Sequence, residues 1–446
     1  MTPALRRPAG RLNLANPAWA MLEYGWYPLL LLIATPWFLH RLGAGQYGHW
    51  MLLLAVVGFG GVLNTGTGAA TIKSVSAGIG GAPSTDIERT VRASLTIALA
   101  GGISLALIVF GVFWIWGEAL FGRMGEPEQV RLTGLTAAAL VALEQVDNVY
   151  SSALKGAEKF SRIAAIEVLS KSVQVIVAAM VLVIWPALIA LYISLLAVAV
   201  LRLIAKTIVA KRLLGLRRIR PAFQGVFELL RFAKWGWLQG VGGVLFGVAD
   251  RMIVGSLLGA ASLAYYSIAT QLAMQVHAIS AAGLSVIFPM VSRMLQSGES
   301  LSLQRIATFT AGGNLLLSSA VALLLLVLGP AFLSSWIGAE AAGPTADVLP
   351  WLVLAYWVLA LNVVPYYILR GIGHIRSVGL TVVIAGMTGT IAMFISVTWL
   401  GLQGAPVGRG VYALVSLALV IPFARHLLLE RNANRRPDAP TQFPAH

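Results

Sequence analysis

The 446-residue sequence contains no cysteine and little charge. Without cysteine, disulfides, thiolate zinc sites, iron–sulfur clusters and cysteine nucleophiles are excluded. Charged residues make up only 11% of the chain and hydrophobic residues make up 58%, with a mean hydropathy of +0.82. A soluble domain carries about 25% charged residues. The composition therefore excludes a soluble enzyme and indicates an integral membrane protein.

Two further features are missing. There is no GxxxxGK[ST] phosphate loop, so the chain does not hydrolyse ATP by that route. The largest external loops expected, near Glu118–Gln129 and Gly338–Asp347, are about a dozen residues each. A membrane enzyme that polymerises or ligates glycans outside the cell needs more material than this, which counts against that class.

Long apolar segments fill most of the chain. Each is long enough to cross a bilayer as a helix, which needs about 20 residues. We expect an all-α membrane protein with twelve spans, at about residues 18–39, 46–72, 91–117, 131–154, 162–184, 187–209, 228–257, 261–289, 307–336, 347–370, 375–400 and 404–428. The first span follows a basic segment, and its length favours an uncleaved helix over a signal peptide.

The net charge of +15 is distributed unevenly along the chain. With the N-terminus in the cytoplasm, 26 of the 32 Lys and Arg residues fall at cytoplasmic ends and loops. Four, including Arg409, fall on the other side. This is a strong positive-inside pattern and predicts that both termini are cytoplasmic. The positive charge is thus a topology signal that also attracts anionic lipid head groups, and nucleic acid is not an expected partner.

The two halves of the chain resemble each other. At a shift of 216 residues, Leu42–Ala44 falls on Leu258–Ala260, and Val75-Ser76 falls on Val291-Ser292. At a shift of 215, Leu154-Lys155-Gly156 falls on Leu369-Arg370-Gly371. The matches predict two parallel six-helix repeats around a central cavity, related by an axis along the membrane normal.

The corresponding domain organisation has four parts. We expect an N-terminal lobe at residues 1–213, a basic cytoplasmic connector at 214–227, a C-terminal lobe at 228–430 and a cytoplasmic tail at 431–446. The tail is polar and contains proline, so we expect it to be disordered from Glu430 onward.

Several motifs carry a family resemblance. They are LGAGQYG after the first span (Leu42–Gly48), GFGGVLNTG in the second (Gly58–Gly66), DRMIVGSLLG ending the seventh (Asp250–Gly259) and PMVSR after the eighth (Pro289–Arg293). Together with the span count, they resemble the Wzx-type flippases of O-antigen and exopolysaccharide units. These belong to the multidrug/oligosaccharidyl-lipid/polysaccharide exporter superfamily.

The resemblance implies a function without catalytic chemistry or a cofactor. The expected cargo is an undecaprenyl-pyrophosphate-linked oligosaccharide, moved from the cytoplasmic to the periplasmic leaflet of the bacterial inner membrane by alternating access. A polysaccharide polymerase and a chain-length regulator are candidate partners. The alternatives are a proton- or sodium-coupled multidrug extruder of the same superfamily and a peptidoglycan-precursor flippase. A cavity rich in Arg and Lys favours a pyrophosphate-linked lipid, and an acidic one favours the extruder.

Charged residues inside spans are the candidate site residues, because each costs about 2.5–3.5 kcal/mol to insert at mid-membrane. Arg251 is the first candidate for a pyrophosphate contact, since guanidinium binds phosphate in a bidentate manner; an inter-helix ion pair is the alternative. Asp250 could pair structurally or take part in ion coupling. Glu23 could hold a proton, pair with a cavity cation or lie at the interface. Lys73 could receive the pyrophosphate or only mark topology.

Glu144 and Asp147 lie three residues apart, on one face of the fourth span. Two close carboxylates suit a proton or sodium site, although sugar contacts or pairing with cations of a neighbouring helix remain open. Glu167 and Lys171, four residues apart, are interpreted as a self-neutralising pair.

Two more cations lie near expected cytoplasmic ends. Lys234 could recruit the anionic lipid or mark topology. Arg370 is pseudo-equivalent to Lys155, and it could line the entrance or extend to the head groups.

Overall fold

The computed structural model of the chain describes residues 15–79, 84–216, 220–284, 287, 291 and 303–434. These residues form helices, with no β-strand among them. In chain order the elements are α1 (Ala15–Phe59), α2 (Gly61–Ile79), α3 (Ser84–Ile115), α4 (Gly117–Phe121), η1 (Gly122–Met124), α5 (Pro127–Gly156), α6 (Phe160–Ile184), α7 (Leu188–Leu214), α8 (Val226–Leu258), α9 (Ala260–Leu284), α11 (Leu303–Ile337), α12 (Ala339–Leu361), α13 (Val363–Gly371), α14 (Ile375–Leu400), η2 (Gly401–Gly404), α15 (Ala405–Ser416), η3 (Leu417–Leu419) and α16 (Val420–Asn434).

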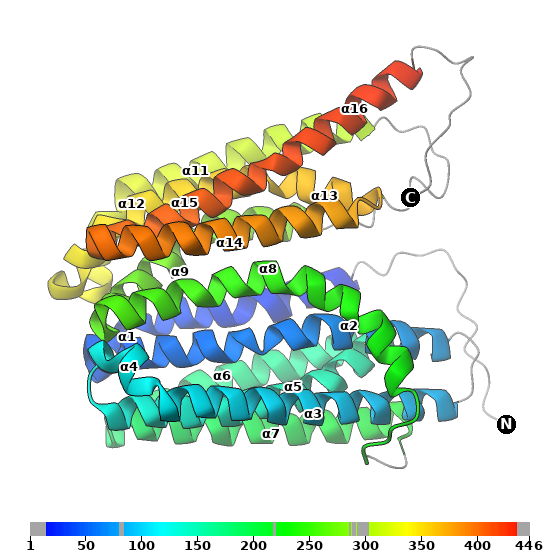
Figure 1. Cartoon of the computed structure of the whole chain (residues 1–446), viewed down its shortest axis with the longest axis horizontal. Helices are drawn as coiled ribbons and strands as arrows, with labels where there is room; N and C mark the ends of the chain where they lie inside the picture. Colours follow the sequence, from blue (N-terminus) through cyan, green and yellow to red (C-terminus); the bar gives the residue numbers. More distant parts are fainter. Residues whose placement is uncertain are drawn as a thin grey trace.

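The helices run along one common direction (Figure 1), and α1 begins at the same end of the bundle at which α16 finishes. Six stretches of the described residues are long and apolar enough to cross a membrane by length and composition: 87–115, 160–184, 188–214, 303–337, 339–371 and 376–428. The last of these holds two expected spans. Five expected spans remain. The first is the part of α1 before Gly43, the second is the rest of α1 together with α2, and the other three are α5, α8 and α9.

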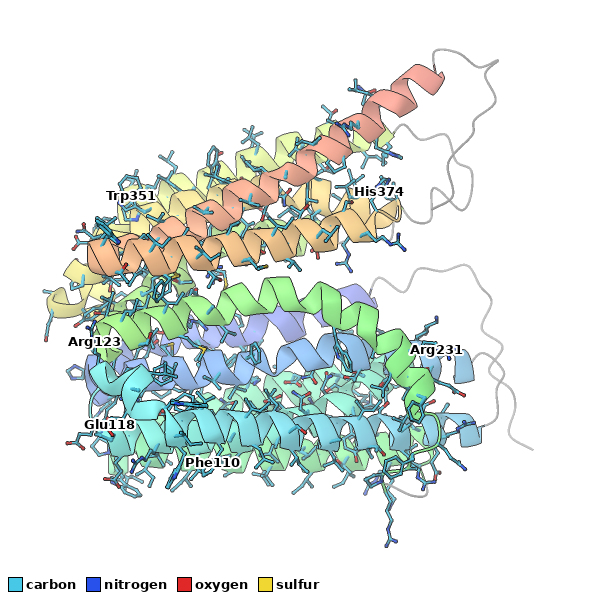
Figure 2. All side chains as sticks on the ribbon, viewed as in Figure 1. Phe110, Glu118, Arg123, Arg231, Trp351 and His374 are labelled. Carbon is cyan, nitrogen blue, oxygen red and sulfur yellow. The ribbon has the colours of Figure 1, made fainter. Side chains whose placement is uncertain are left out.

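Apolar side chains cover the outside of the bundle. Large exposed hydrophobic residues concentrate on outer helices, with Leu107 on α3, Ile184 on α6, Leu316 on α11 and Trp399 on α14 among them. Figure 2 shows Phe110 and Trp351 on the outer faces and places charged residues at the ends, with Arg231 and His374 at one and Glu118 and Arg123 at the other. A long apolar belt with charged ends is the surface that a bilayer requires.

The duplicated sequence motifs occupy matching helix breaks. Gly43 interrupts α1 with φ 73° and ψ 163°, and Gly259 separates α8 from α9 with φ 88° and ψ 178°. Both adopt a positive φ, which glycine takes without steric cost. The two glycines are 216 residues apart, so the first and second spans of each half are joined by the same turn.

The ends of α5 and α13 match as well. The backbone N–H of Lys159 donates to the Leu154 carbonyl at 2.9 Å, and that of His374 donates to the Leu369 carbonyl at 2.9 Å. Glu158 and Gly373, 215 residues apart, both have positive φ. The fold thus bears out the two parallel repeats. In the remaining match, Val291 is described, whereas its neighbour Ser292 lies outside the described residues together with most of the PMVSR motif.

Three boundary expectations are wrong. Glu430–Asn434 continue α16 as a helix, whereas the tail was expected to be disordered from Glu430; residues 435–446 lie outside the described part. The expected loop at Glu118–Gln129 contains α4, η1 and the start of α5, and α12 begins at Ala339 inside the other expected loop. Short helices satisfy backbone groups locally, so a connection of a dozen residues adopts them readily.

The two halves meet through α1 with α9 and through α2 with α8. Glycine permits this approach: a Cβ added to Gly48 on α1 would lie 1.9 Å from the Ala260 carbonyl oxygen on α9. A Cβ added to Gly66 on α2 would lie 2.3 Å from the Ala233 carbonyl oxygen on α8. Small residues at helix contacts let backbones approach closely in membranes.

We expect Gly48→Val to destabilise the protein by about 1–3 kcal/mol, because the new side chain would overlap backbone atoms that cannot rotate away. The measurement is the thermal unfolding midpoint of the purified protein in detergent. Gly45→Val is the matched control, since a Cβ there meets no heavy atom within 4 Å. Equal midpoints for the two variants would show that the Gly48 contact does not hold the halves together.

Candidate functional site

A cavity of about 310 Å³ lies between the two halves of the bundle. Helices α1, α5, α6 and α7 line it from the N-terminal half, and α8 and α9 line it from the C-terminal half. Its polar and charged lining residues are Tyr27, Glu144, Lys171, Gln174, Arg202, Arg251, Ser267, Thr270 and Gln271. The remaining lining residues are apolar or glycine, Met51, Leu140 and Met274 among them. A concave site that combines apolar walls with convergent polar groups has the character of a ligand pocket.

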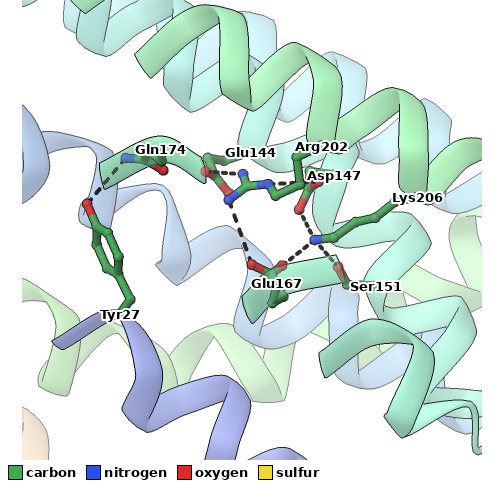
Figure 3. A network of polar contacts seen from close by, with 8 residues as sticks. All are labelled: Tyr27, Glu144, Asp147, Ser151, Glu167, Gln174, Arg202 and Lys206. Atoms are coloured by element: carbon green, nitrogen blue, oxygen red, sulfur yellow. Dashed lines mark hydrogen bonds and ion pairs between the residues drawn. The ribbon is translucent and has the colours of Figure 1, made fainter. Parts of the chain in front are cut away.

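Cations outnumber acids in this cavity. Lys171, Arg202 and Arg251 line it with Glu144 as the only acidic residue in the lining described. Behind this surface lies a network of buried ion pairs between α5, α6 and α7, shown in Figure 3. The network determines which of the lining cations carries uncompensated charge.

Arg202 on α7 contacts three carboxylates. It pairs with Glu144, its Nε lies 3.3 Å from Asp147 Oδ1, and its Nη1 lies 3.8 Å from Glu167 Oε2. The Arg202 side chain is 5% exposed. A buried guanidinium is stable only when its charge and hydrogen-bond donors are satisfied, and these contacts supply both.

Lys206, one turn further along α7, is fully buried. Its Nζ donates to Asp147 Oδ2 at 2.5 Å and to Ser151 Oγ at 2.8 Å, and it also pairs with Glu167. All three N–H groups of the ammonium therefore have acceptors. Asp147 is shared by both cations, so α5 and α7 are joined by a continuous set of ion pairs.

Local helix geometry explains why these residues meet. Glu144, Asp147 and Ser151 recur on one face of α5 at spacings of three and four, and Arg202 and Lys206 lie four apart on α7. Helices α5 and α7 pack against each other, as do α6 and α7. The acidic face of α5 thus meets the basic face of α7, and Glu167 on α6 completes the set.

The interpretation of Glu167 and Lys171 as a pair within α6 is wrong. Glu167 pairs with Lys206 and Arg202 instead. The Lys171 ammonium lies 4.5 Å from the centre of the Tyr27 ring, and Gln174 Nε2 donates to the Tyr27 hydroxyl at 3.3 Å. Among the described residues Lys171 forms no ion pair within 4 Å, because the two acids nearest to it face α7.

The charges of the network balance. Its three carboxylates, Glu144, Asp147 and Glu167, face three cations, Arg202, Lys206 and the nearby Lys171. Arg251 on α8 is outside this balance: it forms no ion pair among the described residues, and its buried Nε has no hydrogen-bond partner there. Arg251 and Lys171 are thus the two lining cations without an ion pair among the described residues, and of these Lys171 has the carboxylates of Glu144 and Glu167 nearby.

Asp250, the neighbour of Arg251, is turned away from the cavity into the C-terminal half. It is 1% exposed, pairs with Arg409 Nη2 at 2.5 Å and accepts a hydrogen bond from the Tyr266 hydroxyl at 3.0 Å. The Arg409 guanidinium also lies 5.2 Å from the centre of the Tyr356 ring. The sequence placed Arg409 at an outer end, but it is 7% exposed and joins α15 to α8.

A second cavity, of about 660 Å³, lies where α2, α3 and α8 approach the end of the bundle at which α1 begins. Lys73 lines it with Arg89, Arg231 and Glu228. Arg89 and Glu228 pair at 3.8 Å and both are largely exposed. Lys73 is exposed as well, so this basic cavity is a wetter site than the one around Arg251.

The other candidates lie apart from both cavities or cannot be placed. Arg370 on α13 donates to the Tyr366 hydroxyl at 3.0 Å and lies over that ring at 5.3 Å. The side chains of Glu23 on α1 and Lys234 on α8 lie outside the described part of the structure. Of the predicted residues, only Arg251 and Glu144 are brought together in one cavity.

Sequence reasoning missed the roles of Arg202, Lys206 and Arg409. The first two were among the 26 Lys and Arg residues counted at cytoplasmic ends and loops, and the third was counted on the other side. A signal was present: Arg202 and Lys206 lie four residues apart inside an apolar run, so both fall on one face of a span and need acidic partners there.

Within the described residues, no group of three or more His, Asp or Glu side chains is placed to hold a metal ion.

Several known proteins resemble this chain in sequence or in fold. A family described as "Polysaccharide biosynthesis protein" matches residues 85–311, just over half of the chain. A Shigella flexneri protein described as "Putative O-antigen transporter" is 21% identical over 426 residues, covering 91% of this chain and 96% of that one. An inward-facing multidrug resistance MATE family transporter of the MOP superfamily has a TM-score of 0.72 at 14% identity, covering 94% of this chain and all of that one. The lipid II flippase MurJ, inward closed, has a TM-score of 0.76 at 10% identity, covering 95% and 94%.

We expect Lys206→Met to destabilise the folded protein by about 3–5 kcal/mol, since it leaves Asp147 and Glu167 buried without their main cation. Adding Asp147→Asn should restore part of the loss, because one uncompensated charge is removed. The readout is the thermal unfolding midpoint in detergent.

Arg89→Gln is the control, because it breaks an exposed ion pair that contributes at most about 1 kcal/mol. A Lys206→Met midpoint equal to that of the wild type would rule out a stabilising role for the network.

Proposed function

Because this chain belongs to the polysaccharide biosynthesis protein family and is a transporter rather than an enzyme, we propose that it flips undecaprenyl-pyrophosphate-linked oligosaccharide units. The cargo moves from the cytoplasmic to the periplasmic leaflet of a bacterial inner membrane. The observation that carries the proposal is Arg251, an unpaired cation in a cavity between two halves.

A pyrophosphate diester supplies the charge that Arg251 lacks. Arg251 is half-buried, and a cation partly removed from water without a partner is unfavourable, so an anion that enters the cavity gains more from it than it would in water. Guanidinium presents paired N–H donors that match two phosphate oxygens. The network around Arg202 lies on the opposite wall, and its three carboxylates balance Arg202, Lys206 and the nearby Lys171, so it does not require an anion.

The multidrug extruder fits this cavity less well. A site for cationic drugs calls for unpaired carboxylates, and the acidic residue described in the lining, Glu144, pairs with Arg202. A peptidoglycan-precursor flippase needs the same pyrophosphate chemistry, and the fold resembles one such protein. The family match and the Shigella relative favour the polysaccharide unit over it.

Alternating access requires a closure that can open. At the end of the bundle opposite the start of α1, the two halves are in contact. Gly48 meets Ala260, Arg123 donates to the Leu257 carbonyl, and Gly259 approaches the Arg123 carbonyl oxygen. These contacts involve glycine residues and backbone carbonyl groups. In our proposal they separate when the cavity opens to the periplasm, and the polymerase and chain-length regulator receive the unit there.

The proposal is tested by lipid analysis in cells that make the precursor and lack this chain. We expect single lipid-linked units to accumulate on the cytoplasmic leaflet. Wild-type protein should relieve this accumulation, whereas Arg251→Ala should lose at least about tenfold in transport because a charge-assisted contact is worth about 1.5–3 kcal/mol. Arg131→Ala is the control, since Arg131 is exposed on the outer surface over Trp114.

Three other results of this lipid analysis would change the conclusion. Relief by wild type and Arg251→Ala alike would keep the flippase and discard the Arg251 contact. No accumulation, in cells without a second flippase, would reject the flippase and favour drug export. Accumulation of the peptidoglycan precursor instead would move the cargo to that lipid.

The orientation is a separate part of the proposal. Both termini lie in the cytoplasm, so the basic cavity around Lys73 and Arg231 faces the leaflet in which the precursor is made. Alkaline phosphatase fused after His446 should be inactive, and the same enzyme inserted after Gly125 in the opposite end should be active. The reverse pattern of activities would invert the topology and with it the direction of transport.

A further inference from the structure

We propose that the cavity face of α9, formed by Ser267, Thr270 and Gln271, binds the first sugar of the lipid-linked unit. This inference rests on the proposed function, because it assigns the part of the cargo next to the pyrophosphate. The three residues recur at spacings of three and four, so they lie on one side of α9. All three line the cavity between the halves.

Two of these side chains, Ser267 and Gln271, have a buried hydrogen-bonding atom without a partner among the described residues, and the Thr270 hydroxyl has only the Tyr266 side chain near it. Ser267 and Thr270 are 1% and 3% exposed. Nine buried side-chain N and O atoms among the described residues have no partner there, and four line this one cavity: Ser267 Oγ, Thr270 Oγ1, Gln271 Nε2 and Arg251 Nε. Buried polar groups are nearly always hydrogen-bonded, so a cluster of exceptions around a cavity points to a polar ligand.

Other hydroxyls in the bundle behave differently. Serine and threonine within helices usually donate to the carbonyl four residues earlier. Thr71, Thr136 and Ser172 do so here, and so does Ser280 on α9 itself. Ser267 and Thr270 form no such bond, although they lie on the same helix as Ser280.

Gln271 is held in place at one end. Its Oε1 lies 3.4 Å from Thr35 Oγ1 on α1, which leaves the amide Nε2 as a donor. The α9 face thus offers two hydroxyls and one amide, all uncharged. Sugar hydroxyls and acetamido groups are also uncharged and both donate and accept, so they match these groups, whereas a phosphate matches Arg251 beside them.

The size of the cavity limits what is recognised. About 310 Å³ is at the lower end of the range for small-molecule pockets. It can hold a pyrophosphate with one sugar, but not a whole oligosaccharide. Apolar lining residues such as Met51 and Met274 can pack against the sugar ring, while the polar side chains of α9 form hydrogen bonds with its hydroxyl groups.

The test is a binding comparison with the purified full-length chain. The probes are geranylgeranyl pyrophosphate, which carries no sugar, and polyprenyl-pyrophosphate-linked N-acetylglucosamine, glucose and galactose. We expect wild type to bind at least one sugar-bearing probe about tenfold more tightly than the sugar-free probe, the gain of one or two hydrogen bonds. In Ser267→Ala/Thr270→Val/Gln271→Met that difference should vanish, with affinity for geranylgeranyl pyrophosphate unchanged within about twofold.

Ser280→Ala is the matched control, because it removes a hydroxyl from α9 outside the cavity; it should keep the sugar preference. The single variants replace the triple variant if the latter does not elute as one folded species. A loss of affinity that is equal for all probes overturns the assignment, as does equal binding of all probes by wild type. Failure of wild type to bind any pyrophosphate would reject the proposed function itself.

Discussion

The structure depends on one constraint, that a charge inside the bilayer must be compensated by protein. Three carboxylates pair with Arg202 and Lys206 between α5, α6 and α7, and Asp250 pairs with Arg409 between α8 and α15. These pairs join helices that apolar packing alone would leave free to rotate. Replacing a buried pair by apolar groups is often neutral, but breaking one is costly. The pairs therefore act mainly by specifying which helix faces meet, and Arg251 remains outside them.

Much of the fold could be predicted because its signals are local. Apolar length gives the spans, Lys and Arg placement gives the expected sidedness, and glycine at positions 43 and 259 gives two identical turns. The errors concern boundaries. The span expected at 347–370 is divided at Asn362 into α12 and α13. A proline at the first turn of a helix is well tolerated, which is where Pro365 stands.

The site was predictable only in part. The spacing of Glu144 and Asp147 predicts one acidic face, and the position of Arg251 predicts a costly buried cation. Which cations meet that face depends on the depth and rotation of α7, and no local pattern encodes these. Arg202 and Lys206 were counted at a cytoplasmic end because they lie near the end of the expected span 187–209. The position of a span end is uncertain by about one helical turn, and over that distance a cation can either contact lipid head groups or form a buried ion pair.

The fold is duplicated, but the charged residues of the cavity and its network are not repeated in the other half. At the shift of 215, Glu144 and Asp147 fall on Leu359 and Asn362, and at 216, Arg251 falls on Thr35. Had both halves kept the same charges, two symmetric binding walls would face each other and a ligand would be held equally by both. Instead the N-terminal half neutralises its own charge, whereas the C-terminal half presents an unpaired arginine and unbonded hydroxyls. A ligand with a charged and a neutral part then has one orientation in the cavity, because only one wall gains hydrogen bonds by holding it.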